Sequence, residues 1–154
     1  MIFLQSSFLL LLLGLLCRLQ LHLICLLLLC IFLCDCHGEK YCVLKIQEDK
    51  LNTLVAPQLK SELVLLNTEG TRNIILDLSE IRFADSSGLS AILIGNRLCT
   101  NVEGSFVLAC PQESVLKLIK ISQLDNILSI LPTLQEAIDY VMMEELERDV
   151  NENE

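Results

Sequence analysis

This sequence has few histidines, and it lacks both tryptophan and the glycine-rich motifs that bind phosphate. It has no tryptophan, and its two histidines, His22 and His37, both lie in the first 37 residues. A Ser-His-Asp hydrolase needs a histidine within hydrogen-bonding reach of its serine, and the G-x-S-x-G turn of such enzymes is also missing. The phosphate-binding motifs G-x-x-x-x-G-K-S/T and G-x-G-x-x-G are missing too. We therefore expect neither catalysis nor a cofactor, although a small enzyme of another kind stays open.

Positive charge is also scarce, with 11 Lys and Arg residues against 20 Asp and Glu residues and a formal net charge of -9. Nucleic-acid backbones are held mainly by Lys and Arg, so we expect no direct binding to nucleic acid. Acidic residues crowd positions 144–154, where Arg148 is the one basic residue. Such a run is typical of a fraying, solvated helix end, and we predict an acidic C-terminal tail over 144–154.

Charge is almost missing from the N-terminal segment, residues 1–37, whose one formal charge before position 35 is Arg18. Residues 8–33 are long enough to cross a bilayer as one helix, for which about 20 residues suffice. Two interpretations stay open, a membrane anchor or upstream sequence read through from a wrongly placed start. A cleaved signal peptide fits less well because the segment opens without basic residues, and no small residue precedes Cys17 as in a lipoprotein. We expect a cytoplasmic protein, anchored only if 8–33 is a genuine span.

Cysteine is plentiful, with eight residues, but the pattern is not that of a disulfide framework. Five cysteines lie in the N-terminal segment, and the other three stand in apolar surroundings that suit buried thiols in a reducing compartment: Cys42, Cys99 and Cys110. The stretch Cys34-x-Cys36-His37 offers three zinc ligands. No second Cys or His pair stands at zinc-finger spacing, so we expect no metal site.

Strand-like and helix-like segments alternate over residues 38–143. The predicted strands are short apolar or alternating runs: 41–46, 73–79, 105–110 and 128–131. The predicted helices have apolar residues at helical spacing: 53–70, 89–96, 112–120 and 134–142. Pro57 is tolerable in a first turn, and Gly70 is a stop signal. This alternation predicts one α/β domain, in which helices cover a small, partly parallel sheet.

The stretch IRFADSSGLSAIL, residues 81–93, joins a strand-like run to a helix-like run through Asp-Ser-Ser-Gly. On local chemistry alone, Ser86 or Ser87 is a helix N-cap, with Asp85 beside the positive end of the helix dipole. A single cap does not explain why an acid, two hydroxyls and a glycine occur together.

The sequence NIILDLSEIRFADSSGLSAIL resembles the signature of STAS domains, the fold of bacterial anti-sigma factor antagonists, and the resemblance extends over about residues 41–143. It implies that Ser86 is the phosphate acceptor, with Asp85, Ser87 and Gly88 forming the surrounding loop. Another acidic position of the family falls on Asn52, where Asn replaces Asp.

The resemblance further implies a binding protein whose partner is an anti-sigma factor serine kinase that uses ATP. Such an antagonist sequesters the kinase and frees a sigma factor for transcription. STAS domains also occur in transporters and sensory complexes, so a STAS module of a membrane transporter or an envelope lipid-transport system is the alternative. Fold alone does not decide between these functions.

Overall fold

The computed structural model describes residues 31–37 and 40–152. Its main sheet has five strands in the spatial order β1-β2-β4-β6-β7. These strands are β1 (Phe32–His37), β2 (Tyr41–Ile46), β4 (Ile74–Asp77), β6 (Phe106–Ala109) and β7 (Ser129–Leu131). β1 runs antiparallel to β2, and the other neighbouring pairs are parallel. A second sheet pairs β3 (Lys50–Leu51) with β5 (Phe83–Ala84) in parallel.

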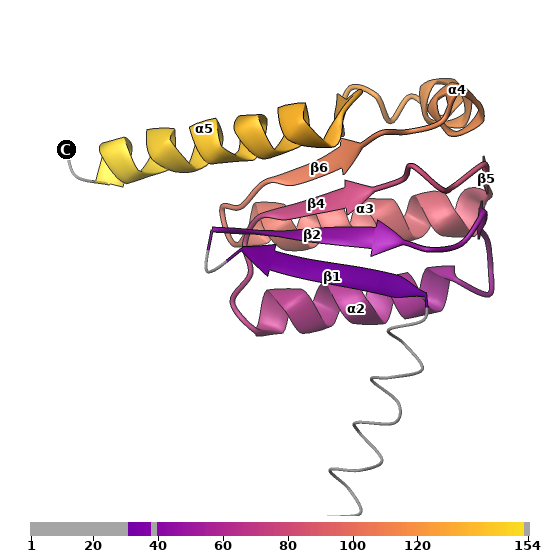
Figure 1. Cartoon of the computed structure of the whole chain (residues 1–154), viewed down its shortest axis with the longest axis horizontal. Helices are drawn as coiled ribbons and strands as arrows, with labels where there is room; N and C mark the ends of the chain where they lie inside the picture. Colours follow the sequence, from indigo (N-terminus) through magenta and orange to yellow (C-terminus); the bar gives the residue numbers. More distant parts are fainter. Residues whose placement is uncertain (1–30, 38–39, 153–154) are drawn as a thin grey trace, which may run out of the picture. The chain divides into compact units, whose positions relative to one another are not determined.

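The helices cover both faces of the main sheet (Figure 1). They are α2 (Ala56–Thr68), α3 (Ser86–Asn101), α4 (Glu113–Ile121) and α5 (Leu134–Glu152). Every residue of β4 and β6 is buried, as expected for parallel strands covered on both faces. Val43, Ile75 and Val107 pack with Ala137 and Val141 of α5, while α2 and α3 cover the other face. The fold class predicted from the sequence, a single α/β domain with a small mixed sheet covered by helices, is confirmed.

Strand β1 was not predicted from the sequence, from which we expected the sheet to begin at Tyr41. β1 pairs with all of β2, and Phe32 is only 3% exposed. Phe32 and Leu33 belong to the apolar run 8–33, which hid the start of the strand, and the remaining stretch, Cys34-x-Cys36-His37, was considered only as a possible set of zinc ligands. Residues 1–30, which hold most of the proposed span, lie outside the described residues. Within 31–37 and 40–152, no helix is long and apolar enough to cross a membrane.

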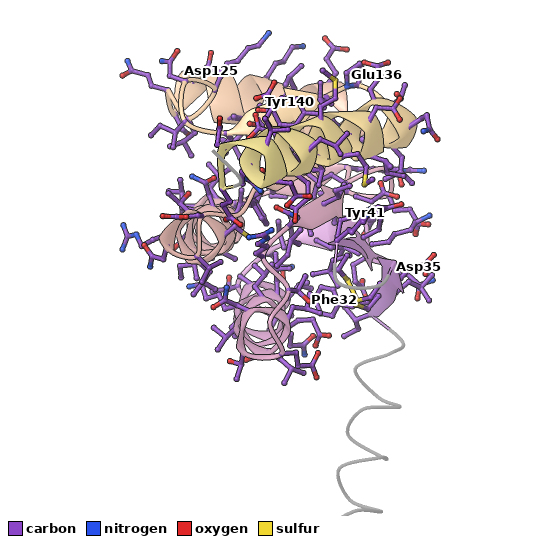
Figure 2. All side chains as sticks on the ribbon, turned by 90° about the vertical axis from the view of Figure 1, so that its left-hand side faces the viewer. Phe32, Asp35, Tyr41, Asp125, Glu136 and Tyr140 are labelled. Carbon is purple, nitrogen blue, oxygen red and sulfur yellow. A yellow bond between two sulfur atoms is a disulfide. The ribbon has the colours of Figure 1, made fainter. Side chains whose placement is uncertain are left out.

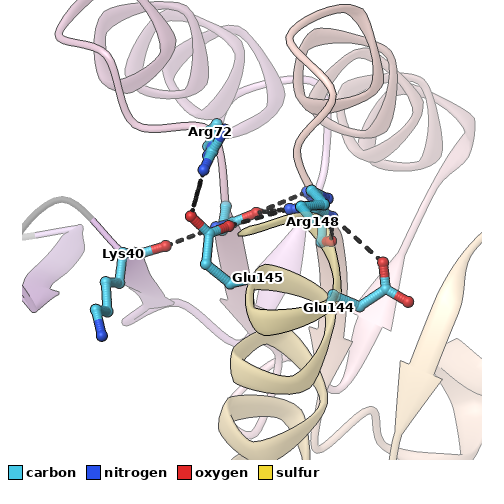
Figure 3. A network of polar contacts seen from close by, with 7 residues as sticks. Lys40, Arg72, Glu144, Glu145 and Arg148 are labelled. Atoms are coloured by element: carbon cyan, nitrogen blue, oxygen red, sulfur yellow. Dashed lines mark hydrogen bonds and ion pairs between the residues drawn. The ribbon is translucent and has the colours of Figure 1, made fainter. Parts of the chain in front are cut away.

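The predicted solvated helix end departs from the structure at Glu145. Helix α5 runs to Glu152 and most of its last residues are exposed, but Glu145 is buried. The Glu145 carboxylate accepts hydrogen bonds from Arg72, from Asn73 Nδ2 at 2.8 Å and from Arg148 Nη1 at 3.1 Å (Figure 3). Arg148 also donates to Asn73 Oδ1 and to the hydroxyl of Ser105. This network holds the end of α5 against the loops that precede β4 and β6.

The same network shifts the ionisation of Glu145. Burial by itself would raise the pKa of this carboxyl, but the hydrogen bonds from Asn73 and Arg72 and the charges of Arg72 and Arg148 hold the pKa below its ordinary value. Glu145 is therefore charged at neutral pH in a nearly buried position.

Candidate functional site

The Asp-Ser-Ser-Gly loop lies at the carboxyl ends of the parallel strands, where β5 leads into α3 (Figure 1). In open α/β sheets this edge is the usual place for binding. The short β3–β5 pair fixes the loop: the backbone N–H of Asp85 donates to Leu51 O at 3.1 Å. The loop that contains Asn52 follows Leu51 directly, so pairing of β3 with β5 brings two predicted site segments together.

Asp85 is the N-cap of α3. Its backbone is extended, and its Oδ1 accepts a hydrogen bond from the N–H of Gly88 at 2.9 Å. The prediction that Ser86 or Ser87 caps the helix was therefore wrong by one or two residues. The cap needs a side-chain oxygen that reaches the third helical N–H, and Asp85 supplies it. The hydroxyls of Ser86 and Ser87 are consequently not needed for capping.

Gly88 is required by a close approach between α3 and β3. A Cβ atom placed on Gly88 would lie 2.5 Å from Leu51 O and 2.7 Å from Leu51 Cγ. These distances are shorter than non-bonded carbon contacts allow. The fourth residue of the motif thus lets the start of α3 rest against the backbone that precedes Asn52.

The two serines differ in accessibility. Ser86 is exposed at the first position of α3, whereas Ser87 is half-buried. The first N–H groups of a helix have no acceptor within the helix. At the start of α3, the N–H of Gly88 donates a hydrogen bond to the Asp85 side chain. The N–H groups at the start of α3 therefore offer donors and the positive end of a helix dipole beside the Ser86 hydroxyl.

Asn52 organises the turn that leads into α2. Its Oδ1 accepts hydrogen bonds from the N–H groups of Leu54 at 2.9 Å and Val55 at 3.3 Å, and its carbonyl accepts one from Ala56 at 2.8 Å. An aspartate could make the same contacts, because a carboxylate oxygen accepts as the amide oxygen does. The replacement of Asp by Asn thus keeps the turn and removes one negative charge.

Two exposed apolar side chains on the segments that form this site were not predicted from the sequence. Leu54, in the turn after β3, is 79% exposed, and Phe83, in β5, is 57% exposed. Single exposed apolar side chains are common on protein surfaces, and they mark a binding surface where they form a contiguous patch. The sequence offered one signal for Leu54, because an apolar residue within a turn is unusual. The exposure of these side chains could not be predicted, because it depends on the pairing of β3 with β5.

Metal-ligating side chains do not gather at this loop. Within residues 31–37 and 40–152, the one group of three or more Cys, His, Asp or Glu side chains close enough to share a metal is Cys34, Cys36 and Cys42. Those residues belong to β1 and to the start of β2, at the opposite end of the strands.

Comparison with known proteins identifies relatives of this chain. The sequence pattern of the STAS domain family matches residues 37–137. A Thermotoga neapolitana protein that is named as an anti-sigma factor antagonist and TM1081 homolog is 34% identical over 73 residues, which make up 47% of this chain and 65% of that protein. The chain thus spans a little under two thirds of the curated relative that it matches.

Solved structures show the same fold. The crystal structure of TM1081 from Thermotoga maritima, also named as an anti-sigma factor antagonist, superposes with a TM-score of 0.65 at 26% identity, covering 72% of this chain and 94% of that one. The phosphorylated form of the Bacillus cell fate determinant SpoIIAA superposes with a TM-score of 0.57 at 24% identity, covering 71% and 98%. With the family pattern over most of its length and the Asp-Ser-Ser-Gly loop at the start of α3, the chain belongs to the STAS domain family.

Proposed function

We propose that this protein is an anti-sigma factor antagonist, a binding module that is switched by phosphorylation of Ser86. The observation that carries the proposal is the exposed Ser86 hydroxyl at the first position of α3, left out of the cap by Asp85. The relatives named as anti-sigma factor antagonists support the same function. Unphosphorylated, the protein binds an anti-sigma factor serine kinase in the cytoplasm and so releases a sigma factor for transcription.

The start of α3 can accept the modification. A kinase transfers the γ-phosphoryl group of ATP to Ser86 Oγ, and ADP leaves. The phosphate adds about -1.5 to -2 charges at neutral pH. Helix N–H groups and the dipole stabilise such a charge by about 0.3–1 kcal/mol. The domain therefore stays folded when Ser86 is phosphorylated.

The same charge disfavours the complex. Leu54 and Phe83 supply exposed apolar area on the segments next to Ser86, and a partner that packs on them would also cover the start of α3. The phosphate would then have to lose its water beside the Asp85 carboxylate. An uncompensated charge in an interface costs several kcal/mol, and every ~1.4 kcal/mol is about a tenfold loss in affinity. Phosphorylation of Ser86 thus releases the partner.

Titration of matched variants against the anti-sigma factor kinase tests this function. Ser86→Ala should bind as tightly as the wild type, and Ser86→Asp should bind at least tenfold more weakly. Ser90 is also exposed and lies one helical turn further along α3, so Ser90→Asp controls for negative charge on the helix and should bind nearly normally.

Equal affinity of Ser86→Asp and the wild type would count against the proposed switch. A pull-down that recovers transporter or envelope lipid-transport components instead of an anti-sigma factor kinase would favour the alternative STAS module.

A further inference from the structure

Three cysteine sulfurs meet where β1 pairs with β2. Cys34 and Cys36 are two residues apart on β1 and point to the same face, and Cys36 lies directly opposite Cys42 in the strand register. Cys34 Sγ is 3.0 Å from Cys42 Sγ and 3.4 Å from Cys36 Sγ. Figure 2 shows sulfur atoms gathered beside β1, near the labels of Phe32 and Asp35. Cys42 was not among the ligands considered from the sequence, because only the strand pairing brings it to the other two.

The cluster has one buried wall and one open side. Cys42 is fully buried, whereas Cys34 and Cys36 are exposed, so a small ion can reach the sulfurs from solvent. Negative charge also surrounds the cluster. The carboxylates of Glu62, Glu69 and Asp35 act electrostatically on Cys34, and negative charge of this kind favours a bound cation.

Cys36 and Cys42 form a disulfide in this structure, and Cys34 is a free thiol. A dithiol reductant, which is itself oxidised to a disulfide, delivers two electrons and two protons and converts the Cys36–Cys42 disulfide into two thiols, which leaves three thiols side by side. The disulfide and a metal bound by all three sulfurs exclude each other. The redox state of the Cys36–Cys42 pair therefore decides whether three ligands are present.

We propose that, when this disulfide is reduced, the sulfurs of Cys34, Cys36 and Cys42 bind one thiophilic d10 cation, Zn²⁺ or Cu(I). Thiolates select these ions, whereas Mg²⁺ and Ca²⁺ prefer oxygen ligands. A Zn–S bond of about 2.3 Å in tetrahedral geometry places sulfurs roughly 3.8 Å apart, so Cys34 Sγ needs to move away from each of the other two sulfurs by less than about 1 Å. The sulfurs of Cys36 and Cys42, no longer bonded after reduction, need to separate further. Rotation of the exposed Cys34 and Cys36 side chains allows this. Each thiol releases its proton to solvent on binding.

This site is separate from the Ser86 loop. Cys42 lies at the amino end of β2, whereas Asp85 and Ser86 follow the carboxyl ends of the strands. A bound ion would hold edge strand β1 to β2 and touch no residue of the proposed switch. Metal binding and partner binding can therefore fail or succeed independently.

Metal content of the full chain tests the proposal. The protein is reduced with a phosphine, freed of reductant without oxygen, mixed with Zn²⁺, desalted and measured for zinc per chain. The wild type should retain one equivalent, and competition with a colorimetric chelator should show at least a tenfold loss of affinity in Cys34→Ser and in Cys36→Ser. Cys110→Ser, which removes a free and partly buried thiol outside the cluster, should bind as the wild type does. Competition with a Cu(I)-specific chelator then shows which of the two ions is held more tightly.

A second readout needs no variant. Zn²⁺ should slow alkylation of Cys34 in the reduced wild type at least tenfold, as mapped by mass spectrometry, and should leave the rate at Cys110 unchanged. Failure of the reduced wild type to retain either ion would overturn the proposal. Full retention of the metal by a folded Cys36→Ser variant, or unchanged alkylation of Cys34, would overturn it as well.

Discussion

Replacing Gly88 by Ala should destabilise the domain, because the new methyl group has no room. Its Cβ would lie 2.5 Å from the Leu51 carbonyl oxygen and 2.7 Å from Leu51 Cγ, and neither atom can move without disturbing β3. Overpacking of this kind costs about 1–3 kcal/mol, while Ala gains at most about 1 kcal/mol over Gly in a helix. We expect a net loss of about 1–2 kcal/mol in the free energy of unfolding. For a domain of this size the melting temperature should fall by about 4–10 °C.

Thermal unfolding followed by circular dichroism measures the effect, with Ser90→Ala as the matched control. Substitution of that exposed residue of α3 should change the melting temperature by no more than about 2 °C, because surface substitutions usually stay within about ±0.5 kcal/mol. A Gly88→Ala variant as stable as the control would refute the close approach between α3 and β3. The glycine of the motif would then have no steric explanation.

Three further outcomes follow from the termini. Glu145→Gln should lower the free energy of unfolding, because it removes the buried charge that pairs with Arg72 and Arg148. The loss should be limited to about 1–3 kcal/mol, because both arginines are partly exposed. An unchanged denaturant midpoint would argue against docking of the α5 end. Because the folded pKa of Glu145 is lowered, its contribution is complete above the unfolded value of about 4.3 and is lost as pH falls through the folded value. The wild type should therefore lose its advantage over Glu145→Gln in acid, and a constant difference would contradict this. A chain from which residues 1–37 are deleted lacks β1 and should have a lower thermal midpoint than a chain from which residues 1–30 are deleted; equal midpoints would show that β1 contributes nothing.

The α/β architecture could be predicted from the sequence because its elements have strong local signals. Residues 74–77 and 106–109 are short β-branched or apolar runs between turn signals, and they form the two fully buried strands. Pro57 lies in the first turn of α2, and Gly70 follows its end with a positive φ of 96°. Each of these features depends on neighbouring residues alone.

Features that depend on distant contacts could not be predicted in the same way. Strand β1 begins at the end of a long apolar run, and its pairing with β2 became visible only in three dimensions. Glu145 looked like one of many solvated acids, and only the positions of Arg72 and Asn73, more than seventy residues earlier, explain its burial. The N-cap was misplaced because α3 begins one residue earlier than expected, at Ser86, so that Asp85 and not Ser86 precedes the helix.

The position of the phosphate tests the proposed switch most directly. The wild type and the Ser86→Ala and Ser87→Ala variants are incubated with the anti-sigma factor kinase and ATP, and the modified residue is located by peptide mass spectrometry. We expect phosphate on Ser86 in the wild type and in Ser87→Ala, and none in Ser86→Ala. Phosphate on Ser87 alone, or equal incorporation into Ser86→Ala and the wild type, would contradict the assignment of Ser86 as the acceptor.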